Sequence, residues 1–292
     1  MTTKKVAFIS DGIPPYELLK TFKKMTPGGT GIWKNIEGVG SIEEADYFGV
    51  IDRTNNPAVP IDKCIFLGAH PPCMDVYSDM SVYPTAVKCY DLKETFGFGE
   101  WWINYTYDQL MALEPPAKTD NLTCILSDQN TRDYHAIRLN YMDNFCKTHS
   151  DALNLYGRIN PRPSMQSCYR GVCGNSHPSA GDYWSGKEPV YLSHKYALEF
   201  DAGPTKNYFS ERFFDAMLLW CMPIYWGSDN IEEYLPKNSF RYVNIDGDGS
   251  DIIDIINSNS YENSIEDIKE ARQLLLNKYN LWERIHSAIF GD

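Results

Sequence analysis

The sequence has no long apolar run and no signal-peptide pattern. No window approaches the roughly 18 uncharged apolar residues that a membrane-spanning helix needs. The first ten residues, MTTKKVAFIS, lead directly into a short apolar run and carry no small-residue cleavage site. We therefore expect a cytoplasmic protein with no signal peptide and no transmembrane segment.

The sequence also lacks paired cysteine motifs. Its eight cysteines are scattered, and none forms a Cys-x-x-Cys pair. In an intracellular chain this pattern predicts buried free thiols. Cys168, Cys173 and His177 do not form a zinc motif, because their spacing is irregular and no fourth ligand is evident.

Positive charge is scarce. The 27 Lys and Arg residues are outnumbered by 39 Asp and Glu residues, which gives a formal net charge of −12. Such a chain repels a phosphate backbone at long range, so we expect no nucleic-acid partner, although a local site for a phosphorylated small molecule stays open. Hydrophobic residues make up 43% of the chain, which excludes a disordered or fibrous protein.

Short apolar runs alternate with helical patterns along the chain, which is typical of mostly parallel sheets covered by helices. In the first part, strands are expected at 5–10, 47–51 and 63–67 and a helix at 16–25. The paired prolines at 115–116 interrupt the pattern. We place a domain boundary there, between residues 1–116 and residues 117–292.

The second part repeats the alternation and ends in two helices from residue 264 onward. Strands are expected at 122–126, 153–156, 196–200, 222–226 and 240–245, helices at 134–147 and 210–220, and a Gly-, Pro- and Ser-rich loop at 160–189. The pattern predicts an α/β protein of two Rossmann-like domains that face each other across a cleft. In such sheets the ligand binds at the carboxyl ends of the strands.

The densest chemical signal lies at the start of the helix expected at 210–220. A helix N-terminus offers unpaired N–H groups and the positive end of the dipole, which suits a diphosphate. Arg212 adds forked donors for phosphate oxygens, and Glu211 can accept hydrogen bonds from sugar or ribose hydroxyls. The alternative is that Glu211 only complements the helix dipole and Arg212 is a solvated surface charge.

The segment from Lys195 to Asp246 resembles the donor-binding motif of the α-1,3-fucosyltransferases. In that family a strand ending Phe-Glu-Asn is followed by a helix start of the form Tyr-x-(Thr/Ser)-Glu-Lys. The counterparts here are Phe200-Asp201-Ala202 and Tyr208-Phe209-Ser210-Glu211-Arg212. The likeness continues, with minor spacing differences, through residues 223–228 and 236–240, and such an ordered run of about fifty residues is hard to obtain by chance.

The resemblance implies a GT-B fold and an inverting transfer of fucose from GDP-fucose to a glycan hydroxyl, with no metal or other cofactor required. It assigns residues 1–116 to the acceptor side and residues 117–292, with the C-terminal helices, to the nucleotide sugar. The donor contacts that it implies are Arg138, Asp201, Tyr208, Glu211, Arg212 and Tyr225.

Two cations are implied for the departing diphosphate. Arg212 corresponds to the Lys of the family's helix start, and Arg138 best matches an Arg from an earlier helix, with Arg132 as the rival because the preceding loop varies in length. Two cations stabilise the negative charge that grows as the glycosidic bond breaks. Glu211 is assigned the contact with the donor sugar or ribose and a catalytic part.

A general base must deprotonate the acceptor hydroxyl. Where the family has a Glu-Ser-Pro element after a strand, this chain has His70 in Gly-Ala-His-Pro-Pro, and histidine titrates near neutral pH. The other interpretation is a loop histidine that binds the acceptor or has no role. Glu94 and Glu100 are alternative carboxylates beside the pair Trp101-Trp102, a pair that packs in a core more often than it stacks on a sugar.

Two departures from the family leave the donor open. Ala202 stands where the family has Asn, and His70 stands where it has Glu. The alternatives are therefore a transferase for another nucleotide sugar, or a sugar-nucleotide-binding protein without transferase activity. Asp246-Gly-Asp248 resembles a metal clamp of a different glycosyltransferase architecture, but it is only a three-residue match in an acidic loop, so we expect no metal there.

Overall fold

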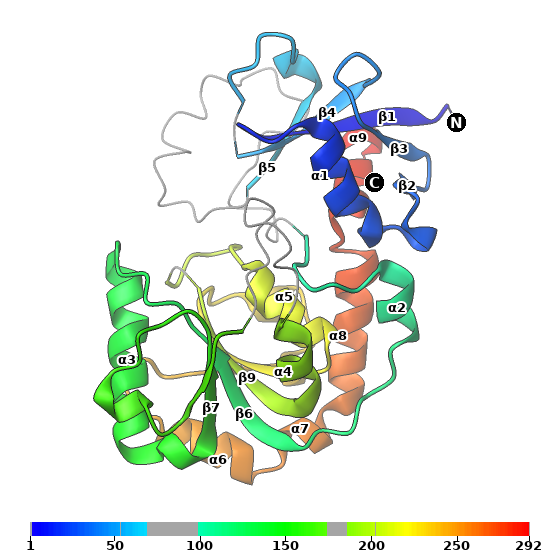
Figure 1. Ribbon diagram of the computed structural model, residues 1–292. Coiled ribbons are helices and arrows are strands. Elements are labelled where there is room, and N and C mark those ends of the chain that lie inside the picture. Colours follow the sequence, from blue (N-terminus) through cyan, green and yellow to red (C-terminus); the bar gives the residue numbers. More distant parts are fainter. Residues whose placement is uncertain (1, 53, 69–98, 174–185, 202, 292) are drawn as a thin grey trace.

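Two β-sheets and the helices around them make up the protein, which we describe from a computed structural model (Figure 1). The structure describes residues 2–52, 54–68, 99–173, 186–201 and 203–291. The strands are β1 (Lys4–Ile9), β2 (Ile32–Trp33), β3 (Ile36–Val39), β4 (Tyr47–Ile51), β5 (Cys64–Leu67), β6 (Asp120–Ile125), β7 (Leu153–Tyr156), β8 (Tyr169–Gly171), β9 (His194–Phe200), β10 (Met222–Trp226) and β11 (Arg241–Tyr242). The α-helices are α1 (Pro15–Phe22), α2 (Tyr107–Ala112), α3 (Asp133–His149), α4 (Lys187–Ser193), α5 (Glu211–Leu218), α6 (Ser250–Asn257), α7 (Ser260–Asn263), α8 (Ile265–Asn277) and α9 (Leu281–Phe290).

The first sheet has the strand order β2-β3-β1-β4-β5. All its pairs are parallel except β2 with β3. The central strand β1 carries apolar side chains on both faces. Val6 and Phe8 face a core shared with helices of the second half of the chain, whereas Ala7 and Ile9 face a smaller core with Phe48 and Phe66. Burial on both faces is what a central parallel strand requires, and it explains the uninterrupted apolar run in the sequence.

The second sheet is wholly parallel, with the order β11-β10-β9-β6-β7-β8. The chain first builds outward from β6 through β7 to β8 and then crosses to the other side of β6 to form β9, β10 and β11. The loops that leave β6 and β9 therefore run in opposite directions. At such a point of strand-order reversal, the switch point, open α/β sheets bind their ligands beside the carboxyl ends of the strands.

The last helix returns the chain to the first domain. Trp282 of α9 is fully buried, packs edge-on against Phe8 with ring centroids 5.2 Å apart, and donates its indole N–H to the Phe22 carbonyl at 3.0 Å. Its ring lies so close to Gly38 that a Cβ there would approach it to 2.6 Å. The helix before it, α8, stays with the second domain, so the α8–α9 segment in red and orange spans both (Figure 1).

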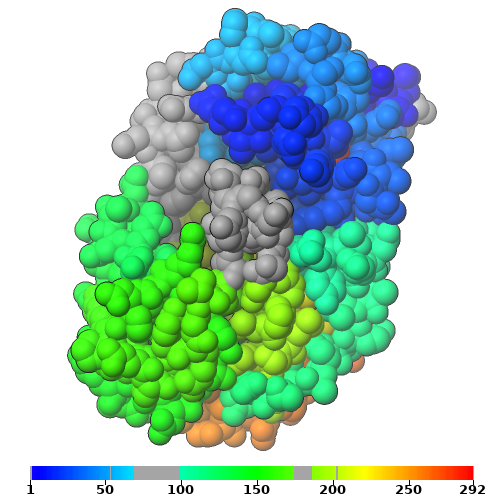
Figure 2. Space-filling view, viewed as in Figure 1, coloured from blue at the N-terminus to red at the C-terminus, as the bar shows by residue number. Residues whose placement is uncertain are grey.

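A buried arginine and the segment after residue 100 also join the domains. Arg272 of α8 donates to the Leu218 carbonyl at 2.9 Å and to the Leu110 carbonyl at 2.7 Å, and its guanidinium lies 4.2 Å from the Trp220 ring centroid. In the space-filling view the blue first domain rests on the teal segment that contains α2 (Figure 2). There the Gly28 N–H donates to Asp108 at 2.7 Å.

The strands that the apolar runs predict are confirmed at β1, β4, β5, β6, β7, β9 and β10, and the two mostly parallel sheets confirm the predicted class of two Rossmann-like α/β domains. The described cysteines are free and buried, as expected. Three expectations were wrong in part. The loop expected at 160–189 contains β8 and overlaps the first residues of α4, and the strand expected at 240–245 shortens to β11. Helix α5 ends before Trp220, whose φ of 63° is incompatible with a continuing helix.

The boundary expected at 116–117 stays a proposal. It falls between α2 and β6, and so between the two sheets. We propose that α9, although it ends the chain, packs as part of the first domain. In the described part of the chain no helix combines the length and the apolar character needed to cross a membrane.

Replacing the α9 tryptophan tests this arrangement. Trp282→Ala removes a fully buried ring, and such truncations cost about 3–5 kcal/mol, so we expect a loss of that size in the free energy of unfolding. Chemical denaturation of the purified variant measures it. Ile137→Ala, at a side chain that is 42% exposed on α3, is the control and should change stability by less than about 1 kcal/mol. Equal effects of the two substitutions would contradict the packing of α9.

Candidate functional site

Two arginines lie at the switch point of the second sheet. Arg138, on α3, is only 2% exposed and donates from Nη2 to the Ser127 hydroxyl at 3.0 Å, in the loop that leaves β6. Arg212, in the first turn of α5, directs Nη1 to the carbonyl of Phe200, the last residue of β9, at 3.4 Å. Each guanidinium is therefore hydrogen bonded at the carboxyl end of one of two neighbouring strands, Arg138 after β6 and Arg212 at the end of β9.

Each arginine is charged and near the other. Burial and the neighbouring Arg212 lower the pKa of Arg138 to about 10, so it stays a cation at neutral pH. Its Nε is buried and has no hydrogen-bond partner among the residues that the structure describes. Burial disfavours the charge of Arg212 as well, but Glu211, Glu199 and Asp201 outweigh it and raise the pKa of Arg212. A pair of like charges at the carboxyl ends of a parallel sheet suits a polyanion.

Arg212 is only partly exposed to solvent. About a third of its side chain is exposed (33%), and its Nε lies 4.0 Å from Glu211 Oε1. Glu211 occupies the first position of α5 and exposes a similar fraction (29%), so both side chains reach the surface at this helix N-terminus. Tyr208, two residues before the N-cap Ser210, is 7% exposed and lies in the same loop.

Asp201 and Tyr225 lie beneath this loop. Asp201 accepts the Ser210 N–H at 3.0 Å and the Tyr225 hydroxyl at 2.5 Å, while that hydroxyl also accepts the Ser228 N–H at 3.1 Å. Tyr225 is fully buried. A Cβ at Gly227 would stand 2.0 Å from the Tyr225 hydroxyl, so only glycine fits there. We propose that these two side chains hold the start of α5 in place and act on a ligand through it.

A second polar network, which the sequence did not reveal, joins the loops after β9 and β10. The Asn207 N–H donates to Asn230 Oδ1 at 2.9 Å, and Asn230 Nδ2 donates back to Asn207 Oδ1 at 2.7 Å. The Ser228 hydroxyl adds a bond of 2.6 Å to Asn230 Oδ1. Satisfied buried networks of this kind rigidify a loop, so the helix start is presented in one defined geometry.

Of the three proposed general bases, the structure describes Glu100. His70 and Glu94 fall outside the described residues, as do Ala202 and His177. Glu100 is described and is 6% exposed. Burial, with the nearby Glu211 carboxylate, raises the pKa of Glu100 well above its usual value, although a hydrogen bond with Trp102 opposes the shift.

The tryptophan pair does not form a sugar platform on both rings. Trp101 is 1% exposed and donates its indole N–H to the Tyr105 carbonyl at 2.9 Å, so it is a core residue. The backbone N–H of Trp102 donates to the fully buried Asp215 at 2.8 Å. Asp215 is also paired with Lys187 at 2.8 Å, which ties this crossing segment to α4 and α5.

Two further ionisable side chains near the arginines, Glu199 and His135, were not predicted from the sequence. Glu199, on β9, is 2% exposed and accepts the Tyr191 hydroxyl at 2.8 Å. Burial raises the pKa of Glu199 to about 8, against the opposing effects of Tyr191, Arg212 and Lys187. His135 lies in the first turn of α3, one turn before Arg138. The signal for His135 was present in its spacing, since residues three apart share a helix face.

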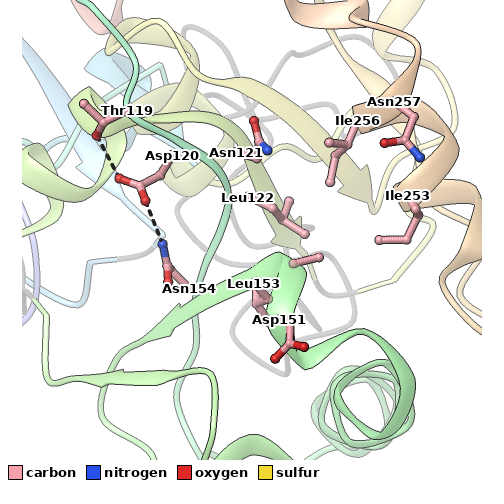
Figure 3. A pocket seen from close by; sticks show the side chains of 11 residues that line it. Thr119, Asp120, Asn121, Leu122, Asp151, Leu153, Asn154, Ile253, Ile256 and Asn257 are labelled. Atoms are coloured by element: carbon pink, nitrogen blue, oxygen red, sulfur yellow. Dashed lines mark hydrogen bonds between the residues drawn. The ribbon is translucent and has the colours of Figure 1, made fainter.

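A cavity of about 410 Å³ lies at the opposite end of the second sheet (Figure 3). It opens at the starts of β6 and β7 and against α6, and its lining includes the carboxylates of Asp120 and Asp151 but no Lys or Arg. Asp120 is engaged there by Thr119 at 2.8 Å and by Asn154 at 3.3 Å. Two carboxylates repel phosphate, so this cavity does not suit a nucleotide.

The sheet topology defines a two-domain Rossmann-like α/β protein with two arginines at the switch point of its second sheet. No family model matches the sequence, and no curated protein does. Among solved structures, a crystal structure of α1,3-fucosyltransferase with GDP is 15% identical with a TM-score of 0.47, covering 96% of this chain and 93% of that one.

Two other solved structures are similar to the same degree. A crystal structure of α1,3-fucosyltransferase with GDP-fucose is 16% identical with a TM-score of 0.47, covering 90% of this chain and 81% of that one. The apo structure of OtsA is 8% identical with a TM-score of 0.47, covering 85% of this chain and 68% of that one. The fold class of this chain rests on its own sheet topology.

Glu199 predicts a pH dependence of stability. A carboxyl whose pKa rises from 4.5 in the unfolded chain to about 8 in the folded one takes up a proton on folding, so the free energy of unfolding falls as the pH rises through that window. Glu199→Gln removes this loss. We expect the variant to match the wild type near its acid end and to exceed it by on the order of 3 kcal/mol at the alkaline end.

Denaturant titrations across the window measure the difference. The exposed Glu43, replaced as Glu43→Gln, is the control and should leave the pH dependence of the wild type unchanged. A Glu199→Gln variant whose stability follows the wild-type curve at every pH would show that Glu199 ionises normally in the folded protein.

Proposed function

We propose that the protein is an inverting, metal-independent glycosyltransferase that resembles the α-1,3-fucosyltransferases and moves fucose from GDP-fucose to a glycan hydroxyl. The observation that carries this proposal is the convergence of Arg138 and Arg212 at the carboxyl ends of β6 and β9. In the sequence resemblance these are the two residues assigned to the diphosphate. Their hydrogen bonds at the carboxyl ends of β6 and β9 support that assignment.

The diphosphate is the leaving group of the proposed reaction. The acceptor oxygen forms a bond to the anomeric carbon, the bond from that carbon to the phosphate oxygen breaks, and GDP departs with the bonding electron pair. Negative charge grows on the phosphate oxygens as this happens, and two fixed cations stabilise it more in the transition state than in the ground state. The rigid loops below Arg212 keep its position constant, so little reorganisation is needed.

The acceptor proton passes to a general base, for which we propose His70, outside the described residues. Glu100 is the alternative that is described. Burial and the Glu211 carboxylate raise the pKa of Glu100, so Glu100 would act as a base only where a bound donor or acceptor favours its charged form. Glu211, exposed at the start of α5, is proposed to accept hydrogen bonds from hydroxyls of the donor sugar or ribose.

Neutralising either arginine should weaken nucleotide binding. Arg138→Met and Arg212→Met each remove hydrogen bonds to a charged phosphate, which are worth about 1.5–3 kcal/mol, so we expect GDP affinity to fall roughly 10- to 100-fold in each. The double variant should show coupling, because one ligand group contacts both side chains. Isothermal titration calorimetry with GDP gives the dissociation constants.

Arg170→Met is the matched control. This exposed arginine on β8 hydrogen bonds to Asn154 at 2.9 Å and lies in the same domain away from the switch point, so its loss should leave GDP affinity unchanged. Full GDP affinity in both Arg138→Met and Arg212→Met would refute the diphosphate site. A wild type that binds UDP but not GDP would keep the site and replace the donor.

Transfer itself is tested with GDP-fucose and a glycan acceptor in the presence of a chelator. An enzyme should form the fucosylated product, or release GDP slowly by hydrolysis, without added metal. Binding with neither reaction would favour the sugar-nucleotide-binding protein over the transferase. His70→Ala and Glu100→Gln then separate the two bases, because the variant that lacks the base should lose turnover while its GDP affinity stays at the wild-type value.

A further inference from the structure

His135 lies beside the arginines and has no part in the donor site described above. It is 5% exposed, in the first turn of α3. Its Nδ1 accepts the backbone N–H of Thr131 at 3.3 Å, and the Thr131 hydroxyl lies 3.3 Å from the same nitrogen. A backbone N–H can only donate, so Nδ1 carries no proton and the ring proton of the neutral imidazole is on Nε2.

The surroundings keep this imidazole neutral. Burial, followed by Arg138, Arg212 and Arg132, lowers the pKa of His135 to about 4 from the usual 6.5. Arg138 and Arg132 belong to α3 and its N-cap, and Arg212 approaches from α5. His135 is thus surrounded by cations and does not add to their charge.

The Nε2–H group of His135 can donate one hydrogen bond. Within the described residues it has no hydrogen-bond partner, because both hydrogen-bond contacts of the ring are made by Nδ1. The neighbouring Arg138 Nε is buried and also has no partner among the described residues. Two unused donors therefore lie one turn apart on the same helix face, in the surroundings of Arg212.

We propose that His135 is a third phosphate-binding residue, whose neutral Nε2–H donates to a non-bridging oxygen of the diphosphate held by Arg138 and Arg212. The inference rests on the proposed function of the two arginines as a diphosphate site and does not depend on which sugar is transferred. A neutral imidazole adds a directed hydrogen bond without increasing the repulsion among three nearby guanidiniums. The two arginines supply charge, and His135 supplies orientation.

The test compares His135→Leu with His135→Gln in the full chain. Leucine removes the donor, whereas the glutamine amide can carry an N–H to about the place of Nε2. With inorganic pyrophosphate and with GDP as probes, calorimetry should show affinity about tenfold weaker in His135→Leu and restored to within roughly threefold in His135→Gln. His149→Leu, at the far end of the same helix, is the control and should bind both probes like the wild type.

Nitrogen-detected NMR of the histidine rings supplies a readout that a merely structural role would not move. At about pH 6 the His135 ring of the free protein should be neutral with its proton on Nε2, where an ordinary histidine is largely charged. An imidazolium, or a proton on Nδ1, would overturn the proposal. So would a His135→Leu variant that binds pyrophosphate and GDP as tightly as the wild type.

The outcomes separate this inference from the proposed function. A GDP affinity that is unchanged in His135→Leu would leave the transferase proposal in place and refute the role of the histidine. Pyrophosphate binding that depends on His135, with no affinity for GDP or GDP-fucose, would support the histidine and refute the donor. A wild type that binds neither pyrophosphate nor GDP would refute both.

Discussion

Two like charges at the switch point of the second sheet are the constraint around which the rest of the site is arranged. Arg138 and Arg212 approach closely enough for Arg212 to lower the pKa of Arg138, and the buried Arg138 Nε has no partner in the described structure. Such an arrangement costs free energy in the folded protein, because buried charges are normally paired and hydrogen bonded. A bound polyanion would relieve the repulsion between the two guanidiniums, and this supports the proposal that a diphosphate binds beside them.

The surrounding structure supplies the rigidity that this strain requires. Asp201 and Tyr225 tie the end of β9 to the start of α5, and the Asn207–Asn230 pair ties the same loop to the one after β10. From the other side, α9 docks on the first sheet through Trp282 and keeps the two domains together. The side chains exposed at the start of α5 thus rest on a framework of buried hydrogen bonds.

The sequence carries most of the fold and part of the site. Buried parallel strands such as β1, β9 and β10 are nearly continuous apolar runs, so pattern alone locates them. The short strands β2, β8 and β11 have two or three residues each and exist only through their neighbours, so local pattern does not define them. The helical pattern of α9 likewise predicts an apolar face, but not that the face packs against β1 in the other domain.

The residues at the start of α5 and around it also differ in how far the sequence predicts them. The sequence resemblance predicts donor contacts for Arg212 and Glu211, and both side chains reach the surface at the start of α5. Asp201 and Tyr225 were expected in the same set, yet the contacts that bury them are tertiary and do not show in a motif. His135 and Glu199 matter because of neighbouring cations and burial, and these arise only when β6, β9 and α3 come together.

The most direct test of the account is a crystal structure of the wild-type protein with GDP bound. We predict electron density for the diphosphate at the carboxyl ends of β6 and β9, within hydrogen-bonding distance of both Arg138 and Arg212. Density for GDP elsewhere, for example in the acidic cavity formed by the starts of β6 and β7, with the two arginines contacting only protein, would contradict the central claim.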